Sequence, residues 1–436
     1  MADYEDTIFA LASGSARAAI AVLRLSGARS GALLDALAGS RPPPRRASLR
    51  RLRDGAGETL DRALVLWLPG PGTYTGEDSA ELHLHGGHAV IEAVAQALVA
   101  AGARPAEAGE FTRRAFLNGR MDLTAAEAVA DLIEAEGAEQ RRQALRQMEG
   151  ALGALYEGWS QRLLRLLAQQ EALIDFPDED LPADIAAGLR AEMAALAAEI
   201  GAHLQDDRRG ERTREGLRIA IIGPPNVGKS SLLNRLLARD VAIVSDLPGT
   251  TRDALEARLV LGGMVMTVID TAGLRATGDR IEAEGVRRAQ ARAAEADIVL
   301  SVGDATDGSK RAGGIFGPGI VIPVANKIDL APNPPSDGAI AVSARTGEGF
   351  EALCAALIEA GRRLTASSGP PPLTRARHRA ALEAAAQALT RAMAEDSEEL
   401  RAEELRASLR MIGRVTGRVG VEDVLGEIFA RFCIGK

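Results

Sequence analysis

The sequence predicts a chain that combines an α/β fold class with an all-α one, in three parts. Near its middle, a glycine-rich loop at 223–230 separates an apolar strand-like run at 219–222 from a helix-like run at 231–237, which indicates a parallel α/β domain. Alanine-rich tracts with few helix breakers lie on both sides of that domain. Short strand-like runs that alternate with helical ones occupy the first 118 residues, so a second α/β domain is expected there.

These signals also predict the domain boundaries. We expect an N-terminal α/β domain at 1–118, a discontinuous helical domain at 119–213 and 373–436, and an α/β domain at 214–366 inserted into it. Insertion is tolerated where the two ends of the inserted domain lie close together. The run Ser367-Ser-Gly-Pro-Pro-Pro372 is typical of a linker that leaves such a domain.

The composition limits the classes of protein that fit. The 436 residues carry a net charge of −8, which argues against a generally basic nucleic-acid binder, and they include two cysteines, too few for a disulfide framework. No apolar run is long enough to cross a bilayer. We therefore expect a soluble, cytoplasmic protein without a membrane partner.

The central loop Gly223-Pro-Pro-Asn-Val-Gly-Lys-Ser230 fits the phosphate-loop pattern GxxxxGK[ST], in the strand–loop–helix context that the pattern requires. Its glycines let backbone N–H groups wrap around the β-phosphate of a nucleotide. Lys229 adds a positive charge, and Ser230 offers a hydroxyl to magnesium. The alternative is a glycine-rich turn without a ligand.

Three further motifs follow in the order expected of a GTPase. In Asp270-Thr-Ala-Gly273, the aspartate can hold the magnesium shell through water and the glycine N–H can sense the γ-phosphate. Asn326-Lys-Ile-Asp329 offers a carboxylate to the N1–H and amino group of guanine, a donor pair that adenine lacks. Ser343-Ala-Arg345 resembles the loop that supports the base from its other side. The ordered set predicts a Ras-like P-loop domain that binds GTP.

The groups that assist hydrolysis differ from those of Ras-type enzymes. Leu274 stands where those enzymes carry the glutamine that orients the attacking water. Asn226, together with Ser245-Asp-Leu-Pro-Gly-Thr-Thr-Arg-Asp253, resembles the GTPases activated by potassium, in which the ion supplies the charge of an arginine finger. Either Thr250 or Thr251 is then the threonine on magnesium, and Thr251 is favoured. The alternative for Asn226 is a loop residue that bonds its own backbone.

These motifs define the predicted site in full. The expected catalytic residues in the loop are Asn226 and Lys229, the magnesium ligands are Ser230 and Thr251, and the potassium ligands are Asn226, Ser245, Leu247 and Thr250. The GTP-binding residues are Asn226, Val227, Gly228, Lys229, Ser230, Ser231, Ser245, Asp246, Leu247, Pro248, Gly249, Thr250, Thr251, Asp270, Thr271, Ala272, Gly273, Asn326, Lys327, Asp329, Ser343, Ala344 and Arg345.

The N-terminal domain contains two stretches that allow more than one interpretation. Its strands are expected at 7–11, 19–25, 63–68 and 79–84, with a helix at 88–98. The arginine-rich stretch 41–53 is either an RNA-facing patch or a solvated connection, and the connection is favoured. Glu81, His83 and His85 share one strand face, which raises the hypothesis of a metal site; a polar pocket wall is preferred because no cysteine lies near.

From residue 122 the pattern is helical. Thr124-Ala-Ala-Glu127 has capping-box spacing. Apolar residues recur at three- and four-residue steps from Leu152 to Leu167, which marks the buried face of a long helix. The remaining segments are expected to be helices at 183–204 and 374–410 and a charged link at 206–215.

The whole chain resembles the bacterial tRNA-modification GTPases of the MnmE (TrmE) family, within the TrmE-Era-EngA-YihA-Septin-like group. Outside the nucleotide motifs, the resemblance rests on stretches that generic GTPases lack. These are Ala21-Val-Leu-Arg-Leu-Ser-Gly27, Tyr74-Thr-Gly-Glu-Asp78 with Glu81 and His85-Gly-Gly87, Gly109-Glu-Phe-Thr-Arg-Arg-Ala-Phe-Leu-Asn118, and the terminal Phe432-Cys-Ile-Gly-Lys436.

The resemblance implies a homodimer joined through the N-terminal domains, with a pocket there for a one-carbon tetrahydrofolate such as the 5-formyl or methylene form. Positions similar to the family's folate contacts are Arg24, Glu81, Arg120 and Lys436. The implied reaction adds an aminomethyl-type group, such as carboxymethylaminomethyl, to carbon 5 of the wobble uridine of certain tRNAs. It is shared with an FAD-dependent, MnmG-type partner in a heterotetramer or larger complex.

Three further expectations come from this resemblance. Glu282 aligns with the carboxylate that orients the attacking water, although the sequence by itself does not prefer it to Glu284. Cys433 lies in the terminal motif and is a candidate for catalysis; the alternative is a tail that packs beside the pocket. The glycine-rich stretch 305–319 departs from the family, since it is barely long enough for a crossover, and a crossover helix there is expected to be lost or vestigial.

Two other classes of protein are alternatives. A ribosome-assembly GTPase that acts as an RNA-binding checkpoint would use the same nucleotide site beside a compact basic module, and none is evident in the sequence. A GTP-regulated metal or membrane accessory protein would need a ligand cluster or an amphipathic anchor, for which His83, His85 and His88 are a poor substitute.

Overall fold

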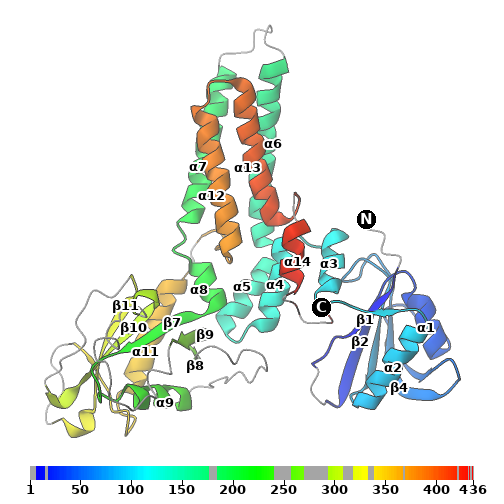
Figure 1. The fold of residues 1–436 in the computed structure, drawn as a ribbon, viewed down its shortest axis with the longest axis horizontal. Coiled ribbons are helices and arrows are strands. Elements are labelled where there is room, and N and C mark those ends of the chain that lie inside the picture. Colours follow the sequence, from blue (N-terminus) through cyan, green and yellow to red (C-terminus); the bar gives the residue numbers. More distant parts are fainter. Residues whose placement is uncertain are drawn as a thin grey trace. The chain divides into compact units, whose positions relative to one another are not determined.

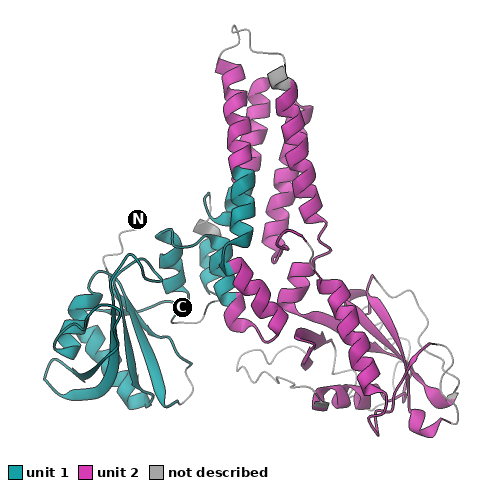
Figure 2. Cartoon of the chain, turned by 180° about the vertical axis from the view of Figure 1, so that it is seen from behind, with its two compact units in different colours: residues 1–130, 148–160, 412–436 teal, residues 131–147, 161–411 magenta. Residues whose placement is uncertain are grey.

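The expected combination of α/β and all-α folds is confirmed (Figure 1). The computed structural model describes residues 6–14, 18–175, 184–239, 257–269, 293–307, 318–331, 338–366, 369–419, 422–430, 432 and 435. The chain divides into two compact units (Figure 2). One comprises residues 1–130, 148–160 and 412–436, and the other comprises residues 131–147 and 161–411.

The first unit is built on a mixed six-stranded sheet in the order β3-β4-β5-β2-β1-β6. Its strands are β1 (Ile8–Leu11), β2 (Ile20–Ser26), β3 (Ser48–Arg53), β4 (Thr59–Leu68), β5 (Ser79–His85) and β6 (Arg104–Pro105). All paired strands are antiparallel except β1 and β6. Helices α1 (Ser30–Ala38) and α2 (His88–Ala100) pack against one face of this sheet.

The alternation of side chains along the strands separates an apolar face from a polar one. Leu82 and Leu84 of β5 belong to the core that α1 and α2 cover. Because successive side chains on a strand point to opposite faces, Glu81 and His83 lie on the other face. Arg24 of β2 is paired in register with Glu81 and lies on that same face. The sheet therefore brings two residues predicted for the folate site together.

The arginine-rich stretch differs from its expected form. The favoured interpretation was a solvated connection, but residues 48–53 form the edge strand β3. Leu52 is fully buried, whereas Leu49, Arg51 and Arg53 are exposed. Arginines occupy both faces of this strand, so its sequence does not show the alternation of apolar and polar residues that marks a strand. An edge strand tolerates such charges, and they also protect its open edge from pairing with other strands.

Helices complete the first unit. They are α3 (Glu110–Leu117), most of α4 (Leu123–Glu134), the first part of α6 (Ala151–Asp175), the end of α13 (Glu398–Thr416) and α14 (Glu422–Ala430). The cap of α4 is not the expected capping box at Thr124. Asp122 caps the helix instead, because its Oδ1 accepts a hydrogen bond of 2.8 Å from the Ala125 amide and one of 2.7 Å from the Thr124 hydroxyl.

The second unit contains a group of long helices that run side by side (Figure 1). They are α7 (Asp184–Leu204), α12 (Ala376–Ala394) and the adjoining parts of α6 and α13; α5 (Ala138–Met148) also belongs to this unit. The charged link expected at 206–215 includes a short helix, α8 (Arg209–Glu215). None of the helices in the described part of the chain is both long and apolar enough to span a bilayer.

The second sheet has the order β12-β11-β10-β7-β9-β8. Its strands are β7 (Leu217–Ile222), β8 (Ala257–Leu261), β9 (Met264–Val268), β10 (Ile298–Asp304), β11 (Ile320–Asn326) and β12 (Ile340–Ala341). Only β8 is antiparallel to its neighbour. Helices α9 (Lys229–Arg239) and α11 (Phe350–Thr365) contribute to its core. We expected a crossover helix between β10 and β11 to be lost or vestigial. Residues 308–317 of that connection lie outside the described part of the chain, so this expectation stays a prediction.

The chain enters and leaves this α/β region at neighbouring points. Arg214 Nε donates a hydrogen bond of 2.9 Å to the Thr374 carbonyl, and the Leu373 amide donates one of 3.1 Å to Asp206 Oδ2. This proximity is the geometry that an inserted domain requires.

A matched pair of leucines tests the assignment of the two faces of the first sheet. We expect Leu82→Ala to lower the free energy of unfolding by about 2–5 kcal/mol, since Leu82 is buried under the helices. Leu64→Ala on the adjacent strand should cost about 0.5 kcal/mol or less, because that side chain is exposed. Urea unfolding followed by the fluorescence of Trp67, which lies in the same core, measures both; equal losses would contradict the assignment.

Candidate functional site

The phosphate loop lies between β7 and α9 and has the backbone geometry that its pattern requires. Gly223 and Gly228 have φ values of 155° and 91°, and a Cβ atom on Gly228 would stand 2.3 Å from Asn326 Nδ2. The Lys229 ammonium donates hydrogen bonds of 2.9 and 2.8 Å to the Gly223 and Pro224 carbonyls, and burial lowers its pKa. The glycines are therefore required both by conformation and by space.

Asn326 joins the phosphate loop to the loop that follows β12. Its side chain is buried, Nδ2 donates a hydrogen bond of 2.8 Å to the Val227 carbonyl, and Oδ1 accepts one of 3.0 Å from the Ala344 amide. One amide side chain thus connects three segments that are separate in the sequence. The structure shows Asn326 to be a bridge between loops, which the sequence motif alone did not indicate.

The guanine-binding residues predicted from the sequence also lie close together. Asp329 Oδ1 accepts a hydrogen bond of 2.7 Å from the Ser343 hydroxyl, and the Thr346 amide donates one of 3.1 Å to the same hydroxyl. Arg345 Nη1 is 4.0 Å from Asp329 Oδ2, with its side chain largely exposed. The carboxylate is thereby oriented before any base arrives.

One residue of this site was not singled out from the sequence. Asp304, at the carboxyl end of β10, accepts a hydrogen bond of 2.6 Å from Lys327 Nζ. Burial raises the pKa of Asp304, but the bonds from Lys327 and Thr306 outweigh this effect and hold the pKa below its ordinary value. Its position at the end of a parallel strand, where ligands of α/β sheets bind, is the signal that could have revealed it.

Many predicted residues lie outside the described part of the chain. These are Ser245, Asp246, Leu247, Pro248, Gly249, Thr250, Thr251, Asp270, Thr271, Ala272, Gly273, Glu282, Glu284, Cys433 and Lys436. Their assignments stay predictions. Asn226, Ser230 and Ser231 lie at the turn into α9 as expected, and Asn226 is exposed with a left-handed φ of 62°.

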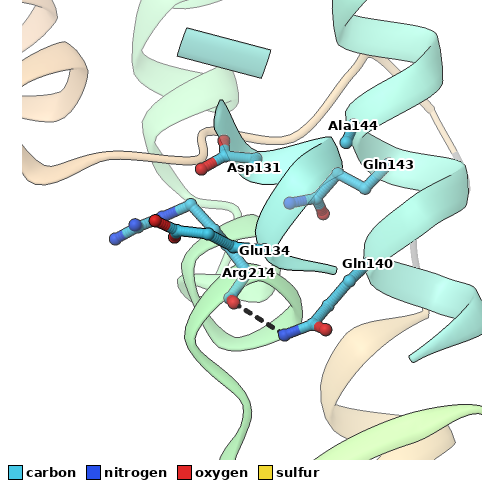
Figure 3. A pocket seen from close by; sticks show the side chains of 6 residues that line it. All are labelled: Asp131, Glu134, Gln140, Gln143, Ala144 and Arg214. Carbon is cyan, nitrogen blue, oxygen red and sulfur yellow. Dashed lines mark hydrogen bonds between the residues drawn. The ribbon is translucent and has the colours of Figure 1, made fainter. Parts of the chain in front are cut away.

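A small polar pocket in the second unit is a junction between helices. Asp131, Glu134, Gln140, Gln143, Ala144 and Arg214 line it (Figure 3). Gln140 Nε2 donates to the Arg214 carbonyl and Gln143 Nε2 to the Gly210 carbonyl, both at 2.9 Å, while Asp131 accepts a bond of 2.7 Å from Arg375. These groups hold α8 and the start of α12 beside α4 and α5, so the pocket serves packing.

A second polar site lies on the face of the first sheet opposite α1 and α2, beside the part of that face that packs against Phe111 of α3. Arg24 donates hydrogen bonds of 3.2 Å from Nε and 3.0 Å from Nη2 to Glu81 Oε1. His83 Nε2 stands 3.4 Å from the other oxygen of Glu81. Both members of the ion pair are partly exposed, at 29% and 20% of their side chains. The pair can therefore exchange its internal bonds for those of a ligand.

The histidines nearby do not form a metal centre in the described chain. His85 Nδ1 is 2.7 Å from Asp61 Oδ1, and His88 is nearly fully exposed beside Glu92. Among the residues that the structure describes, no three His, Cys, Asp or Glu side chains are grouped so that they could hold a metal ion. His83, beside Glu81, belongs to the wall of the polar site.

Two other segments approach this face. A Cβ atom on Gly76 would be 3.3 Å from Arg120 Cδ, so the Arg120 side chain packs along the loop between β4 and β5. A Cβ atom on Gly435 would be 2.2 Å from the Leu11 carbonyl, so the C-terminal motif reaches the end of β1. The residue that precedes Lys436 thus contacts the N-terminal sheet.

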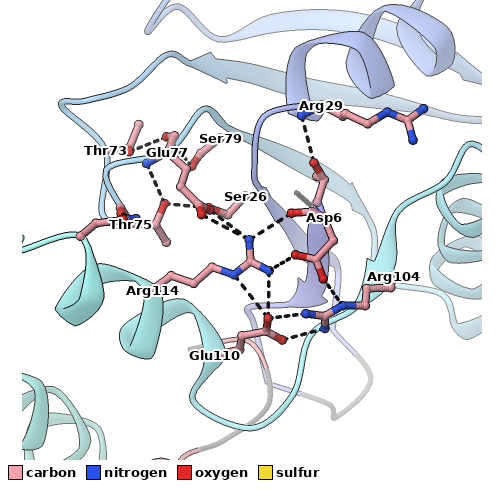
Figure 4. A network of polar contacts seen from close by, with 12 residues as sticks. Asp6, Ser26, Arg29, Thr73, Thr75, Glu77, Ser79, Arg104, Glu110 and Arg114 are labelled. Atoms are coloured by element: carbon pink, nitrogen blue, oxygen red, sulfur yellow. Dashed lines mark hydrogen bonds and ion pairs between the residues drawn. The ribbon is translucent and has the colours of Figure 1, made fainter. Parts of the chain in front are cut away.

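A buried network of charges supports the same loop (Figure 4). The side chains of Arg114 and Glu110 are wholly buried, and Arg114 Nη2 donates hydrogen bonds of 2.9 Å to Glu110 and 2.7 Å to Asp6. Glu110 also accepts bonds from both terminal nitrogens of Arg104, at 2.9 and 2.6 Å. Burial raises the pKa of Glu110, but the bonds from Arg104, the Glu107 amide and Arg114 outweigh it, so the pKa lies below its ordinary value.

The fold and the central site define the class of protein. A phosphate loop between β7 and α9, with Asn326 at the end of β11, Asp329 after it and Ser343 after β12, is the arrangement of a P-loop GTPase. The family model described as "MnmE helical domain" matches residues 123–433, and the one described as "GTP-binding protein TrmE N-terminus" matches residues 7–120. The chain belongs to the MnmE (TrmE) family of tRNA modification GTPases.

Curated relatives agree with this assignment. The "tRNA modification GTPase MnmE" of Gluconacetobacter diazotrophicus is 58% identical over 98% of this chain and 98% of its own length. That of Granulibacter bethesdensis is 55% identical over 99% of this chain and 100% of its own. The FeoB G-domain from Methanococcus jannaschii is 23% identical and covers 34% of this chain and 98% of that one, with a TM-score of 0.25, too low to contribute to the assignment.

A substitution at Asp329 tests whether this carboxylate makes the site prefer guanine over other bases. We expect Asp329→Asn to weaken GTP binding by about 10- to 100-fold, because a carboxylate that accepts hydrogen bonds is replaced by an amide. Xanthosine triphosphate, which carries a carbonyl in place of the amino group of guanine, should bind the variant better than GTP does. Titration with fluorescent nucleotides measures both affinities, and Asn234→Ala on the exposed side of α9 is the control. An unchanged preference for GTP would contradict the role of Asp329.

Proposed function

We propose that this protein is a potassium-dependent GTPase that helps to add an aminomethyl-type group, such as carboxymethylaminomethyl, to carbon 5 of the wobble uridine in tRNA. An FAD-dependent, MnmG-type protein would be the partner, and a 5-formyl or methylene tetrahydrofolate would supply the carbon. The observation that carries the proposal is that one chain of this family has both a GTP site in its second unit and a partly exposed Arg24–Glu81 site in its first.

The phosphate loop suits an ion beside the nucleotide. The backbone of Asn226 is left-handed, its side chain is exposed, and no hydrogen bond ties its amide to another described residue. This favours ion binding over the alternative in which the amide bonds its own backbone. Potassium bound by Asn226 with Ser245, Leu247 and Thr250 would supply the positive charge that Ras-type enzymes take from an arginine finger.

The remaining roles follow from the nucleotide motifs. Lys229 would contact the phosphates, and Ser230 with Thr251 would hold magnesium. Glu282 is proposed to orient the attacking water, since Leu274 offers no polar group for that task. These residues position the reactants and balance the developing negative charge, which is most of what phosphoryl transfer requires of a protein.

The chemistry of the first unit suits a reduced folate. A carboxylate such as that of Glu81 can accept hydrogen bonds from the N–H groups of a pteridine ring, and arginines pair well with the carboxylates of a glutamate tail. Arg24 and Arg120 border the site, and Lys436 follows the residue that contacts β1. Cys433 stays a candidate for catalysis. We also propose that the protein is a cytoplasmic homodimer joined through its N-terminal domains.

Salt dependence tests the mechanism of hydrolysis. We expect GTP hydrolysis to be on the order of 100-fold faster in potassium than in sodium buffer, because one charge that stabilises the transition state depends on the ion. Asn226→Ala should abolish the difference, whereas Asn234→Ala, an exposed asparagine on α9, should keep it. Steady-state phosphate release measures these rates, and equal rates of the unaltered protein in both salts would refute the potassium mechanism.

The tRNA reaction is tested by mass spectrometry of wobble nucleosides. Cells that lack this protein should lose the carboxymethylaminomethyl-type uridine, and the unaltered gene should restore it. Arg24→Ala should fail to restore it, because the folate site loses a charged contact, while Arg190→Ala on the exposed side of α7 should succeed. A normal nucleoside profile in cells without the protein would contradict the proposed function.

A further inference from the structure

The loop between β4 and β5, residues 70–78, is attached to helix α3 at three successive places. The Tyr74 hydroxyl is 2.8 Å from the Thr112 hydroxyl, and Asn118 Nδ2 donates a hydrogen bond of 2.8 Å to the Thr75 carbonyl. Between them, Arg114 Nη1 donates bonds of 3.3 and 3.4 Å to the two carboxylate oxygens of Glu77. We call this segment the 70–78 loop.

Glu77 also attaches the loop to the sheet beside Arg24. Its Oε2 accepts a hydrogen bond of 2.6 Å from the Ser26 hydroxyl, which is also 2.7 Å from the Thr75 hydroxyl. Ser26 lies two residues after Arg24 on β2, so the two side chains share one face of the sheet. Glu77 is thus the one group in Figure 4 that links the buried Arg114 to the strand that carries Arg24.

The opposite side of the loop forms part of the polar site. The Arg24 guanidinium stands 5.9 Å from the centre of the Tyr74 ring, and Arg120 packs along Gly76. Tyr74 is 36% exposed, which leaves part of its ring available to a ligand. A shift of the loop would therefore move an aromatic ring relative to Arg24 and displace Arg120.

We propose that Glu77 and Arg114 are positioning residues of the Arg24–Glu81 site: they hold the 70–78 loop so that Tyr74 forms an aromatic wall beside Arg24 for a flat heterocyclic ligand. This inference rests on the proposed folate function of that site. This role accounts for the wholly buried side chains of Arg114 and Glu110 behind the loop. Arg114 fixes Glu77 through two nitrogen–oxygen contacts, Asp6 and Glu110 in turn fix Arg114, and Arg104 pairs with both of those carboxylates.

The charges of the network indicate which variant tests the proposal without unfolding the unit. Two arginines, Arg104 and Arg114, face three carboxylates, Asp6, Glu77 and Glu110. Removing Arg114 would leave buried carboxylates in excess. Glu77→Ala leaves two positive and two negative charges, so the network stays balanced while its link to the loop is lost.

The test is a titration of the full-length protein with 5-formyltetrahydrofolate. We expect Glu77→Ala to weaken binding by about 10- to 100-fold with little change in melting temperature, because a misplaced wall costs affinity but not core packing. Asn118→Ala, which changes no charge, should act in the same direction. Glu107→Ala is the matched control, since that carboxylate is 70% exposed and lies 3.6 Å from Arg113, outside the network that holds the loop.

A second readout follows the loop itself. Burial raises the pKa of Tyr74, although the bond with Thr112 and the charge of Arg24 oppose this effect. In Glu77→Ala the pKa of Tyr74 should fall toward its ordinary value of 10.0, as measured by tyrosinate absorbance with Tyr74→Phe to assign the signal. A change in packing elsewhere would not move this titration.

The outcomes distinguish a failure of the proposed folate function from a failure of the positioning roles of Glu77 and Arg114. If the unaltered protein does not bind the folate, the proposed function of the site fails and this inference fails with it. If the unaltered protein binds and both Glu77→Ala and Asn118→Ala bind equally well, the inference alone is overturned. If Glu77→Ala does not fold, Asn118→Ala decides: a weakened affinity supports the proposal and an unchanged one overturns it.

Discussion

The parallel alignment of β7, β10, β11 and β12 is the constraint on which the GTP site depends. Parallel strands end at the same edge of a sheet, so the loops that follow them meet there although they are about a hundred residues apart in the sequence. The bond from Asn326 to Val227 is a direct product of that alignment. It ties the phosphate loop to the guanine-binding loops.

The first unit also positions polar residues for a ligand, but on a sheet whose strands are mostly antiparallel. Successive residues of its strands alternate between two faces, so apolar residues beneath α1 and α2 stabilise the domain while Arg24 and Glu81, on the opposite face, remain partly exposed. The loop that borders this face has little apolar surface to bury. Charged bonds from α3 replace hydrophobic contacts there. A polar site is thereby held in place on the face opposite α1 and α2.

Most of the fold could be predicted from the sequence, because its elements have strong local signals. The strand before the phosphate loop was expected at 219–222 and runs from Leu217 to Ile222, since an apolar run ended by glycine leaves few alternatives. Where the prediction was wrong, tertiary contacts outweighed the local pattern. Residues 48–53 form a strand because Leu52 is buried beneath α1, and the charged run at 206–215 becomes helical where Arg214 and Gly210 meet the linker.

The sequence by itself determined the class of nucleotide, the order of the domains and the residues that could touch phosphate and guanine, because those functions require particular side chains at fixed spacing. It did not reveal Asp304 as the partner of Lys327, Asn326 as a bridge, or Glu77 as the link between Arg114 and Ser26. Each of these contacts joins residues from 18 to 99 positions apart, where spacing carries no information. Only the folded chain, by bringing strand ends and helix faces together, decided which polar groups would be neighbours.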